Sequence, residues 1–269
     1  MMKKILNILR ALAFWKKVVP VKIPIKSYEA LLQGKTALVT GGAGGIGYAI
    51  AKRLVESGCD VYIFGRNESK MMEASNLIGC KYRVLDITNV DDIKTVVANV
   101  CKDATPDILV NCAGVMGHGR FGNVDVENWD QVINTNVRGT FFMTQEVSNV
   151  MIARKVKGHI LNLSSSSALR PCYSAYIVSK HLVRDLTQGF AKELIKHGIV
   201  VNAIAPGPTA TNMIGADEKD LADLNVPAGR MATVDEIANY AVSLVSEMGD
   251  MVVGSTLYIT GGSGIVTCE

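Results

Sequence analysis

The sequence predicts a doubly wound α/β fold in which a single domain is built on one parallel sheet of seven strands. Short β-branched runs alternate with longer helical patterns at intervals of about 25 to 30 residues, as in strands joined by crossover helices. A glycine-rich turn follows the first run directly and opens a helical pattern. The expected strands are Thr36–Thr40, Val61–Phe64, Tyr82–Leu85, Ile108–Val110, His159–Leu163, Val200–Ile204 and Thr256–Ile259.

The chain divides by charge into an amino-terminal extension, residues 1–33, and a body, residues 34–269. The extension carries seven basic residues and one acidic residue, a net charge of +6, whereas the body carries 21 basic and 24 acidic residues, a net charge of −3. The net charge of +3 for the whole chain therefore comes from the extension. Because the body is slightly acidic, we expect no nucleic-acid partner. Residues 207–230, rich in Pro, Gly and Asp, are expected to form a mobile flap.

The extension has the pattern of a basic amphipathic helix. Such a helix lies in a membrane interface with its cations on anionic headgroups, or it covers the body of the protein or a sister subunit. The sequence leaves both interpretations open for residues 3–17, and a strap containing Pro20 and Pro24 follows. The expected apolar side holds Ile5, Ile8, Leu9 and Leu12, and the polar side holds Lys3, Asn7, Arg10 and Lys17.

Cysteine usage and hydropathy indicate the compartment. The six cysteines are far apart and lack the Cys and His spacing of a zinc site, so we expect reduced thiols and no metal. No apolar run reaches the roughly 18 to 20 residues that span a bilayer. We therefore expect a cytoplasmic protein, with peripheral contact at the inner face of a membrane if residues 3–17 bind one.

The turn from Thr40 to Gly47 has the composition of a phosphate-binding loop. Glycines let the backbone approach a pyrophosphate closely, and the N-terminus of the following helix, expected from Tyr48, favours its negative charge. The glycines fit two spacings, one on Gly42, Gly44 and Gly47 and the other on Gly41, Gly45 and Gly47. The position of the turn, between the first strand and a helix, predicts a dinucleotide site.

The end of the second strand bears on which dinucleotide binds. An acidic residue there normally holds the ribose hydroxyls of NAD(H), but this strand ends with Gly65-Arg66-Asn67. A guanidinium forks onto a 2′-phosphate, which a carboxylate repels. Arg66 therefore favours NADP(H), with NAD(H) as the alternative if Arg66 is only a solvated turn residue.

Tyr176 and Lys180 lie one turn apart at the start of a long helical pattern and so share a face. A tyrosine ordinarily has a pKa of about 10, and a neighbouring cation favours the phenolate, which suits the phenol for proton transfer near neutral pH. Upstream, an apolar strand ends in four serines, Ser164–Ser167. Hydroxyls at the carboxyl end of such a strand can donate to a substrate oxygen.

From Gly34 to about Gly264 the chain resembles the short-chain dehydrogenase/reductase family. The glycine turn, the serine-ended strand and the Tyr-x-x-x-Lys pair occur in the order typical of that family. Further matching segments are Asp86-Ile87 after the third strand, Asn111-Cys112-Ala113-Gly114 after the fourth, Asn134–Gly139 with its Asn136, and the loop from Pro206 to Thr211. Cys112 stands where the family pattern has a second Asn.

The resemblance implies a role for each matching residue. It makes Tyr176 the general acid in carbonyl reduction, and Ser165 the residue that holds the substrate oxygen. It has Lys180 bind the nicotinamide ribose and favour the phenolate, while Asn136 positions a water in a proton relay. The cofactor contacts that it implies are Gly41, Gly45, Ile46, Gly47, Arg66, Asn67, Asp86, Ile87, Asn111, Ala113, Gly114, Tyr176, Lys180, Pro206, Gly207, Thr209 and Thr211.

The register of the active-site serine departs from the family pattern. Family members commonly place this serine thirteen positions before the tyrosine, and that position is Leu163, which has no hydroxyl. Alignment on the strand selects Ser165 instead, with Ser164 as the alternative. The loop between Ser165 and Tyr176 is then about two residues shorter than usual, which changes the substrate pocket.

The resemblance leaves the substrate open. We expect an NADP(H)-preferring oxidoreductase that interconverts a ketone and a secondary alcohol, as a homodimer or homotetramer. Its substrate is a small-molecule or carrier-bound carbonyl, such as a 3-oxoacyl thioester. The alternative is a sugar or sugar-phosphate ketone used in cell-surface polysaccharide synthesis. A hypothesis from a different class of protein is a non-catalytic dinucleotide-binding redox sensor. Such a sensor does not need the proton relay of Asn136, Tyr176, Lys180 and a serine, so their joint presence argues against it.

Overall fold

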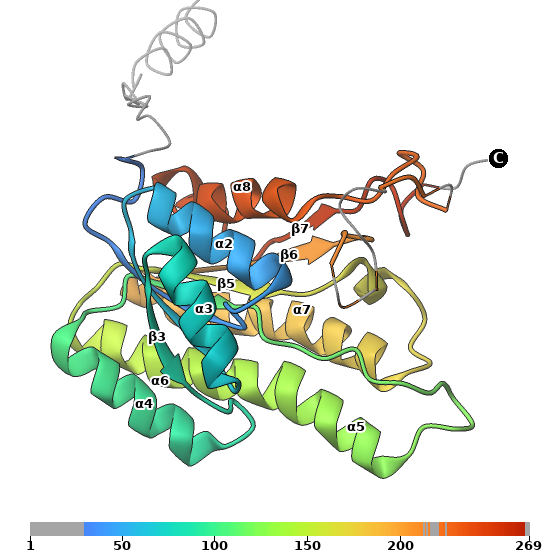
Figure 1. The fold of residues 1–269 in the computed structure, drawn as a ribbon, viewed down its shortest axis with the longest axis horizontal. Helices are drawn as coiled ribbons and strands as arrows, with labels where there is room; N and C mark the ends of the chain where they lie inside the picture. The colour runs from blue at the N-terminus through green and yellow to red at the C-terminus, as the bar shows by residue number, and fades with distance from the viewer. Residues whose placement is uncertain (1–29, 212, 214, 216–220, 224, 267–269) are drawn as a thin grey trace, which may run out of the picture.

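A computed structural model describes residues 30–211, 213, 215, 221–223 and 225–266. It contains one sheet of seven parallel strands in the order β3-β2-β1-β4-β5-β6-β7 (Figure 1). The doubly wound fold is therefore confirmed, and no predicted strand end is wrong by more than two residues. The strands are β1 (Thr36–Thr40), β2 (Asp60–Gly65), β3 (Lys81–Val84), β4 (Ile108–Asn111), β5 (His159–Leu163), β6 (Val200–Pro206) and β7 (Thr256–Ile259).

Helices cover both faces of the sheet (Figure 1). Helices α2 (Gly45–Glu56), α3 (Glu68–Ile78) and α8 (Val234–Leu244) lie on one face, and α4 (Val90–Asp103), α5 (Val126–Ile133), α6 (Thr140–Ala153) and α7 (Ala175–Leu194) lie on the other. Shorter turns of helix are η2 (Asn134–Gly139), η3 (Ser166–Leu169), η4 (Ile195–His197) and η5 (Glu247–Gly249).

The two helical layers explain why the strands are so apolar. Successive side chains of a strand point to opposite faces, so Ala37 and Val39 of β1 pack toward α2 and α8, while Leu38 packs toward α4 and α6. Every residue of β4 and β6 is buried. A strand covered on both faces lacks the alternation of polar and apolar residues seen at a wet surface, and its sequence is a nearly continuous apolar run.

The strand order reverses between β1 and β4, and this reversal positions the functional site. The chain leaves β1 for α2 on one face and leaves β4 for α5 and α6 on the other, so a crevice opens at the carboxyl edge. The Thr40 hydroxyl oxygen joins the two exits, because it accepts hydrogen bonds from the backbone N–H groups of Cys112 and Ala113, each at 3.1 Å.

Two regions of the sequence prediction lie partly outside the described residues. Residues 3–17, with the predicted amphipathic helix, fall there, so their contact with a membrane stays a prediction. At the described end of the extension, Leu32 is buried in the core. In the 207–230 segment, the described residues form two isolated bridges, Thr209 with Ala232 and Ala222 with Arg230. Within the described part of the chain, no helix is long and apolar enough to cross a membrane.

Helix α8 begins with a capping box that is sensitive to pH. The Thr233 hydroxyl accepts a hydrogen bond from the Glu236 N–H at 3.2 Å, and the Glu236 carboxylate accepts one from the Thr233 N–H at 2.9 Å. The Arg230 guanidinium donates to both oxygens of this carboxylate, at 2.7 and 2.9 Å. The hydrogen bonds from Arg230 and from the Thr233 backbone lower the pKa of Glu236 to about 2.

We expect Glu236→Gln to weaken the fold at pH 7, by less than about 1 kcal/mol because the pair is partly exposed. Since the pKa of the folded state is lowered from 4.5 to about 2, the ionised carboxylate stabilises the fold fully above pH 4.5 and progressively less as the pH falls toward 2. The free energy of unfolding of wild type and of Glu236→Gln can be measured with urea between pH 7 and pH 3. The difference between the two free energies should shrink as the pH falls. A difference in unfolding free energy that does not change with pH contradicts this explanation. The control variant is Glu127→Gln, in the first turn of α5.

Candidate active site

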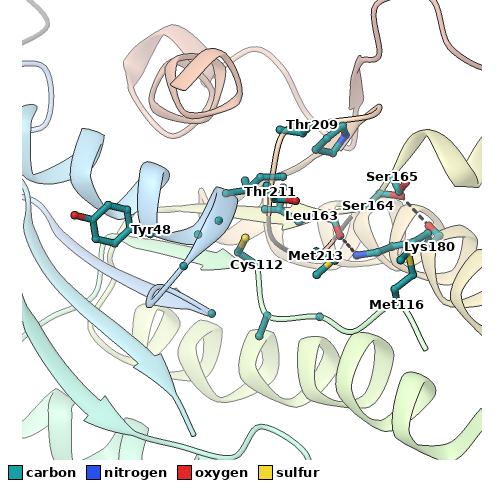
Figure 2. A pocket seen from close by; sticks show the side chains of 18 of the residues that line it. Tyr48, Cys112, Met116, Leu163, Ser164, Ser165, Lys180, Thr209, Thr211 and Met213 are labelled. Atoms are coloured by element: carbon teal, nitrogen blue, oxygen red, sulfur yellow. Dashed lines mark hydrogen bonds between the residues drawn. The ribbon is translucent and has the colours of Figure 1, made fainter. Parts of the chain in front are cut away.

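A cavity of about 1070 Å³ opens at the carboxyl edge of the sheet, where β1, β4, β5 and β6 end (Figure 2). Its walls are the glycine turn after β1, the loops after the other three strands, and parts of α3 and α7. In Figure 2, Tyr48 lies on one side of the cavity, and Ser165 and Lys180 lie on the other, with Cys112 and Thr211 between them. The cavity is thus long and joins the phosphate-binding turn to the Tyr-x-x-x-Lys helix.

The predicted residues fall into two groups with respect to this cavity. Those that line it are Gly41, Gly45, Ile46, Gly47, Ala113, Gly114, Ser165, Tyr176, Lys180, Pro206, Gly207, Thr209 and Thr211. Those that do not line it are Arg66, Asn67, Asp86, Ile87, Asn111 and Asn136. The first group brings together four loops and one helix from distant parts of the sequence.

The glycine turn leaves the N-terminus of α2 open toward the cavity. Gly44 caps the helix without any side-chain hydrogen bond, and the first turn holds no acidic residue. A Cβ on Gly44 would meet nothing within 4 Å, whereas a Cβ on Gly47 would lie 2.3 Å from the backbone oxygen of Gly41. The turn can therefore pack tightly against α2 while its free N–H groups donate hydrogen bonds to an anion, which fits the diphosphate of a dinucleotide. The helix begins at Gly45, three residues before the predicted Tyr48.

Two predicted cofactor residues at the end of β2 lie beside the cavity without lining it. Arg66 is exposed. The Asn67 side chain caps α3 by accepting a hydrogen bond from the Lys70 N–H at 3.0 Å. Helix α3 then contributes Lys70, Glu73, Ala74 and Leu77 to the cavity wall. Sequence reasoning missed these four residues, although their spacing marks one helical face.

The loop after β3 is held in place by hydrogen bonds to the side chain of its Asp86. The Asp86 carboxylate accepts hydrogen bonds from the N–H and the hydroxyl of Thr88, at 2.9 and 2.8 Å. Ile87 packs against Gly139, where a Cβ would lie 2.7 Å from the Ile87 Cδ1. This contact ties the loop to η2, the helical segment that carries Asn136.

Asn111 at the end of β4 belongs to a buried polar network. Its amide donates hydrogen bonds to the Thr144 hydroxyl and to the Asn162 side chain, both at 2.9 Å. Asn162 in turn donates to the Thr187 hydroxyl at 3.0 Å. The network joins β4 and β5 to α6 and α7. The Asn111 side chain therefore points away from the cavity, which Ala113, two residues further along the chain, lines.

Tyr176 and Lys180 come from the first turns of α7. Ser174 caps this helix, its hydroxyl accepting a hydrogen bond from the Ile177 N–H at 3.4 Å. The Lys180 ammonium lies 5.6 Å from the centre of the Tyr176 ring and donates a hydrogen bond to the backbone oxygen of Leu163 at 2.8 Å. The cation is buried against the end of β5, which fixes its position beside the phenol.

Asn136 occupies a π-helical turn between α5 and α6, a geometry often found at functional sites. Its side-chain oxygen accepts a hydrogen bond from the Val115 N–H at 2.8 Å, and its amide donates to the Val115 oxygen at 2.9 Å and to the Ser179 hydroxyl at 3.0 Å. A Cβ on Gly114 would lie 3.2 Å from the Asn136 side-chain oxygen and 3.7 Å from the Lys180 ammonium. Asn136 thus joins the loop after β4 to α7 directly beneath the cavity.

The hydrogen bonds distinguish the two candidate serines. The Ser164 hydroxyl donates to the backbone oxygen of Lys180 at 2.8 Å, so its proton is already used inside the protein (Figure 2). The Ser165 oxygen accepts a hydrogen bond from the Ser167 N–H at 3.1 Å, which leaves its own proton available. Both serines line the cavity. Ser165 is therefore the better donor to a substrate oxygen.

Cys112 lines the cavity in place of the asparagine of the family pattern. A Cβ on Gly47 would lie 3.3 Å from its sulfur, so the thiol fills the space between the glycine turn and β4. Burial raises the pKa of Cys112 to about 12, although the nearby Lys180 charge lowers it. Since only a thiolate is a strong nucleophile, Cys112 acts as a packing residue.

Comparisons with known proteins agree with this geometry. Residues 41–264 match the sequence model of the family described as enoyl-(acyl carrier protein) reductase. The chain is 38% identical over 243 residues to 2-dehydro-3-deoxy-D-gluconate 5-dehydrogenase of Bacillus subtilis (strain 168), covering 86% of this chain and 95% of the relative. It is 33% identical over 238 residues to 3-oxoacyl-[acyl-carrier-protein] reductase FabG of Rickettsia bellii, covering 86% and 97%.

A solved structure titled short chain dehydrogenase/reductase family protein superimposes with a TM-score of 0.80 at 34% identity, covering 88% of this chain and all of that one. These relatives and this solved structure match the chain over almost their whole length, and the solved structure shares its fold. The chain belongs to the short-chain dehydrogenase/reductase family and is an NAD(P)-dependent oxidoreductase.

Proposed function

We propose that the protein interconverts a ketone and a secondary alcohol with NADP(H) as its preferred cofactor, and that Tyr176 is the general acid in reduction. The observation that carries this proposal is that one cavity is lined by the open end of α2, Ser165, Tyr176 and Lys180 together. The first feature fits a diphosphate, and the other three fit a carbonyl oxygen that gains charge and then a proton.

Each residue has one task in this scheme. The N–H groups at the start of α2 bind the diphosphate. The Ser165 hydroxyl donates a hydrogen bond to the substrate oxygen, and Tyr176 delivers the proton as that oxygen becomes an alkoxide. Lys180 favours the phenolate that remains, and Asn136, which is hydrogen-bonded to Val115 and Ser179, positions a water in the proton relay. A bound reduced nicotinamide supplies the hydride.

The preference for NADP(H) is supported by Arg66. It is exposed at the carboxyl end of β2, next to the Asn67 cap of α3, so its guanidinium is free to reach a 2′-phosphate there. The described acid that lines the cavity is Glu73 on α3, one turn after Lys70. A positively charged side chain at the end of β2 thus stands where a carboxylate would favour NAD(H).

The substrate is proposed at the level of a class, because the relatives are named for different carbonyl compounds, a gluconate derivative and an acyl-carrier-bound 3-oxoacyl group. We expect NADPH oxidation with at least one member of a panel of acyl thioesters, sugar ketoses, keto acids and steroid ketones. Measurement at 340 nm with and without each carbonyl checks this. Failure of every member to accelerate NADPH oxidation contradicts the proposal.

A second copy of the chain is the proposed partner. Large apolar side chains are exposed on α5, α6 and α7, among them Trp129, Phe141 and Leu182. Phe141 also stacks against Phe190 with ring centres 5.4 Å apart, which extends one apolar surface across α6 and α7. Such a surface supports the homodimer or homotetramer expected from the family resemblance.

A further inference from the structure

Arg170 lines the cavity and has no role in the scheme above. It lies five residues after Ser165 and six before Tyr176, in the loop that is shorter than the family pattern. It directly follows η3, which begins at the serine cluster, and its side chain is exposed. The loop therefore places a positively charged guanidinium in the wall of the substrate region.

The backbone around Arg170 is held on both sides. Its N–H donates a hydrogen bond to the Ser167 oxygen at 3.1 Å, and its carbonyl oxygen accepts one from the His181 Nε2 at 2.8 Å. The Arg184 guanidinium donates to the Ala168 oxygen at 3.1 Å. Since His181 and Arg184 both belong to α7, the helix of Tyr176, the loop is fixed relative to the reacting groups.

The Arg170 guanidinium makes no hydrogen bond or ion pair within the described ranges of the chain. Other arginines there do, since Arg184 pairs with Asp185 at 3.1 Å and Arg230 with Glu236 at 2.7 Å. The acid that lines the described part of the cavity is Glu73, and it belongs to α3, whereas Arg170 lies in the loop before α7. The charge of Arg170 is thus left for a ligand.

We propose that Arg170 binds an anionic oxygen group, a carboxylate or a phosphate, on the substrate at a distance from the reacting carbonyl. This inference rests on the proposed function and adds the substrate class, a small oxo or hydroxy compound that carries a negative charge. The planar guanidinium matches either anion through two parallel hydrogen bonds. It binds the ground state and the transition state alike, because the anion takes no part in the hydride transfer. Arg170 then sets specificity through KM.

The test uses matched substrates that differ only in the charged group. The carboxylate arm compares D-gluconate with D-glucitol, both oxidised by NADP⁺, and acetoacetate with its methyl ester, both reduced by NADPH. The phosphate arm compares D-fructose 6-phosphate with D-fructose, both reduced by NADPH. We expect the wild-type protein to turn over a charged member with a higher kcat/KM than its neutral partner. Arg170→Met should raise KM for the charged member about 10- to 100-fold, with little change in kcat or in the neutral reaction.

Two further variants separate charge from loop structure. Arg170→Lys keeps the charge without the fork and should restore part of the lost affinity, and Arg53→Met, in the last turn of α2 and outside the cavity, should leave both members unchanged. The proposal is overturned if Arg170→Met changes KM equally for the charged and the neutral member of a pair. It is also overturned if the wild-type protein has the higher kcat/KM with the neutral members. Lack of turnover with every pair, when the carbonyl panel also fails, overturns the proposed function itself and this inference with it.

Discussion

Replacing Tyr176 by Phe is expected to lower kcat for carbonyl reduction by about 10²- to 10⁴-fold, the range that a positioned general acid contributes. The substitution removes one oxygen and keeps the ring, so its packing at the start of α7 and its contact with the Lys180 cation remain. The alkoxide formed by hydride transfer then has no phenol to protonate it. NADPH affinity, measured by quenching of the cofactor fluorescence, should change little, because the anion site at α2 is untouched.

Tyr173→Phe is the matched control for this variant. Tyr173 precedes the same helix, is partly exposed, and lies under the Arg120 guanidinium, whose carbon is 5.0 Å from the ring centre. Removal of its hydroxyl leaves that contact in place and should leave kcat within about twofold of wild type. Turnover of Tyr176→Phe equal to that of wild type contradicts the assignment of Tyr176 as the acid.

Replacing Arg66 by Asp is expected to shift cofactor preference from NADPH toward NADH. The change removes hydrogen bonds to a charged phosphate, adds a carboxylate that repels it, and supplies the acceptor that ribose hydroxyls prefer at this position. The ratio of kcat/KM for NADPH to that for NADH should fall by about 100-fold or more, at constant substrate concentration. Most of the fall should come from KM for NADPH, since the 2′-phosphate is remote from the nicotinamide.

Arg83→Asp provides the control for a general loss of positive charge near β2. Arg83 lies on the neighbouring strand β3, paired with Phe64 in the register, and its guanidinium donates a hydrogen bond to the Tyr82 oxygen at 2.8 Å. We expect its cofactor ratio to match that of wild type. An unchanged ratio in Arg66→Asp removes the argument for 2′-phosphate recognition.

The sequence was a reliable guide to the sheet because each strand carries its own signal. Strands buried on both faces are mostly apolar along their length, and the short runs of β4 and β6 have this composition. The glycine turn was recognisable for a similar reason, since Gly47 leaves no room for a Cβ beside the Gly41 oxygen. Local chemistry of this kind is visible without knowing which strands are neighbours.

The parts of the site that the sequence did not show depend on contacts between distant segments. Asn111 matches a family motif, yet its side chain turns inward because β4 pairs with β5 and places Asn162 opposite it. The sequence selects Ser165 by alignment on the strand and leaves Ser164 as the alternative, and the hydrogen bonds that distinguish the two serines, to α7 and within the serine cluster, are visible only in the fold. Arg170 has no motif at all, and its place in the cavity wall is set by the fold of one short loop.

The most direct test of the proposed reaction follows the transferred hydrogen itself. The carbonyl panel is repeated with NADPH that carries deuterium in place of both C4 hydrogens of the nicotinamide, so that transfer from either face labels the product, and the products are analysed by mass spectrometry for wild type and Tyr176→Phe. We predict a secondary alcohol with one deuterium on the carbinol carbon for wild type, and a strongly reduced yield for the variant. Tight binding of NADPH without deuterium in any product contradicts this account and identifies a dinucleotide-binding protein that catalyses no carbonyl reduction.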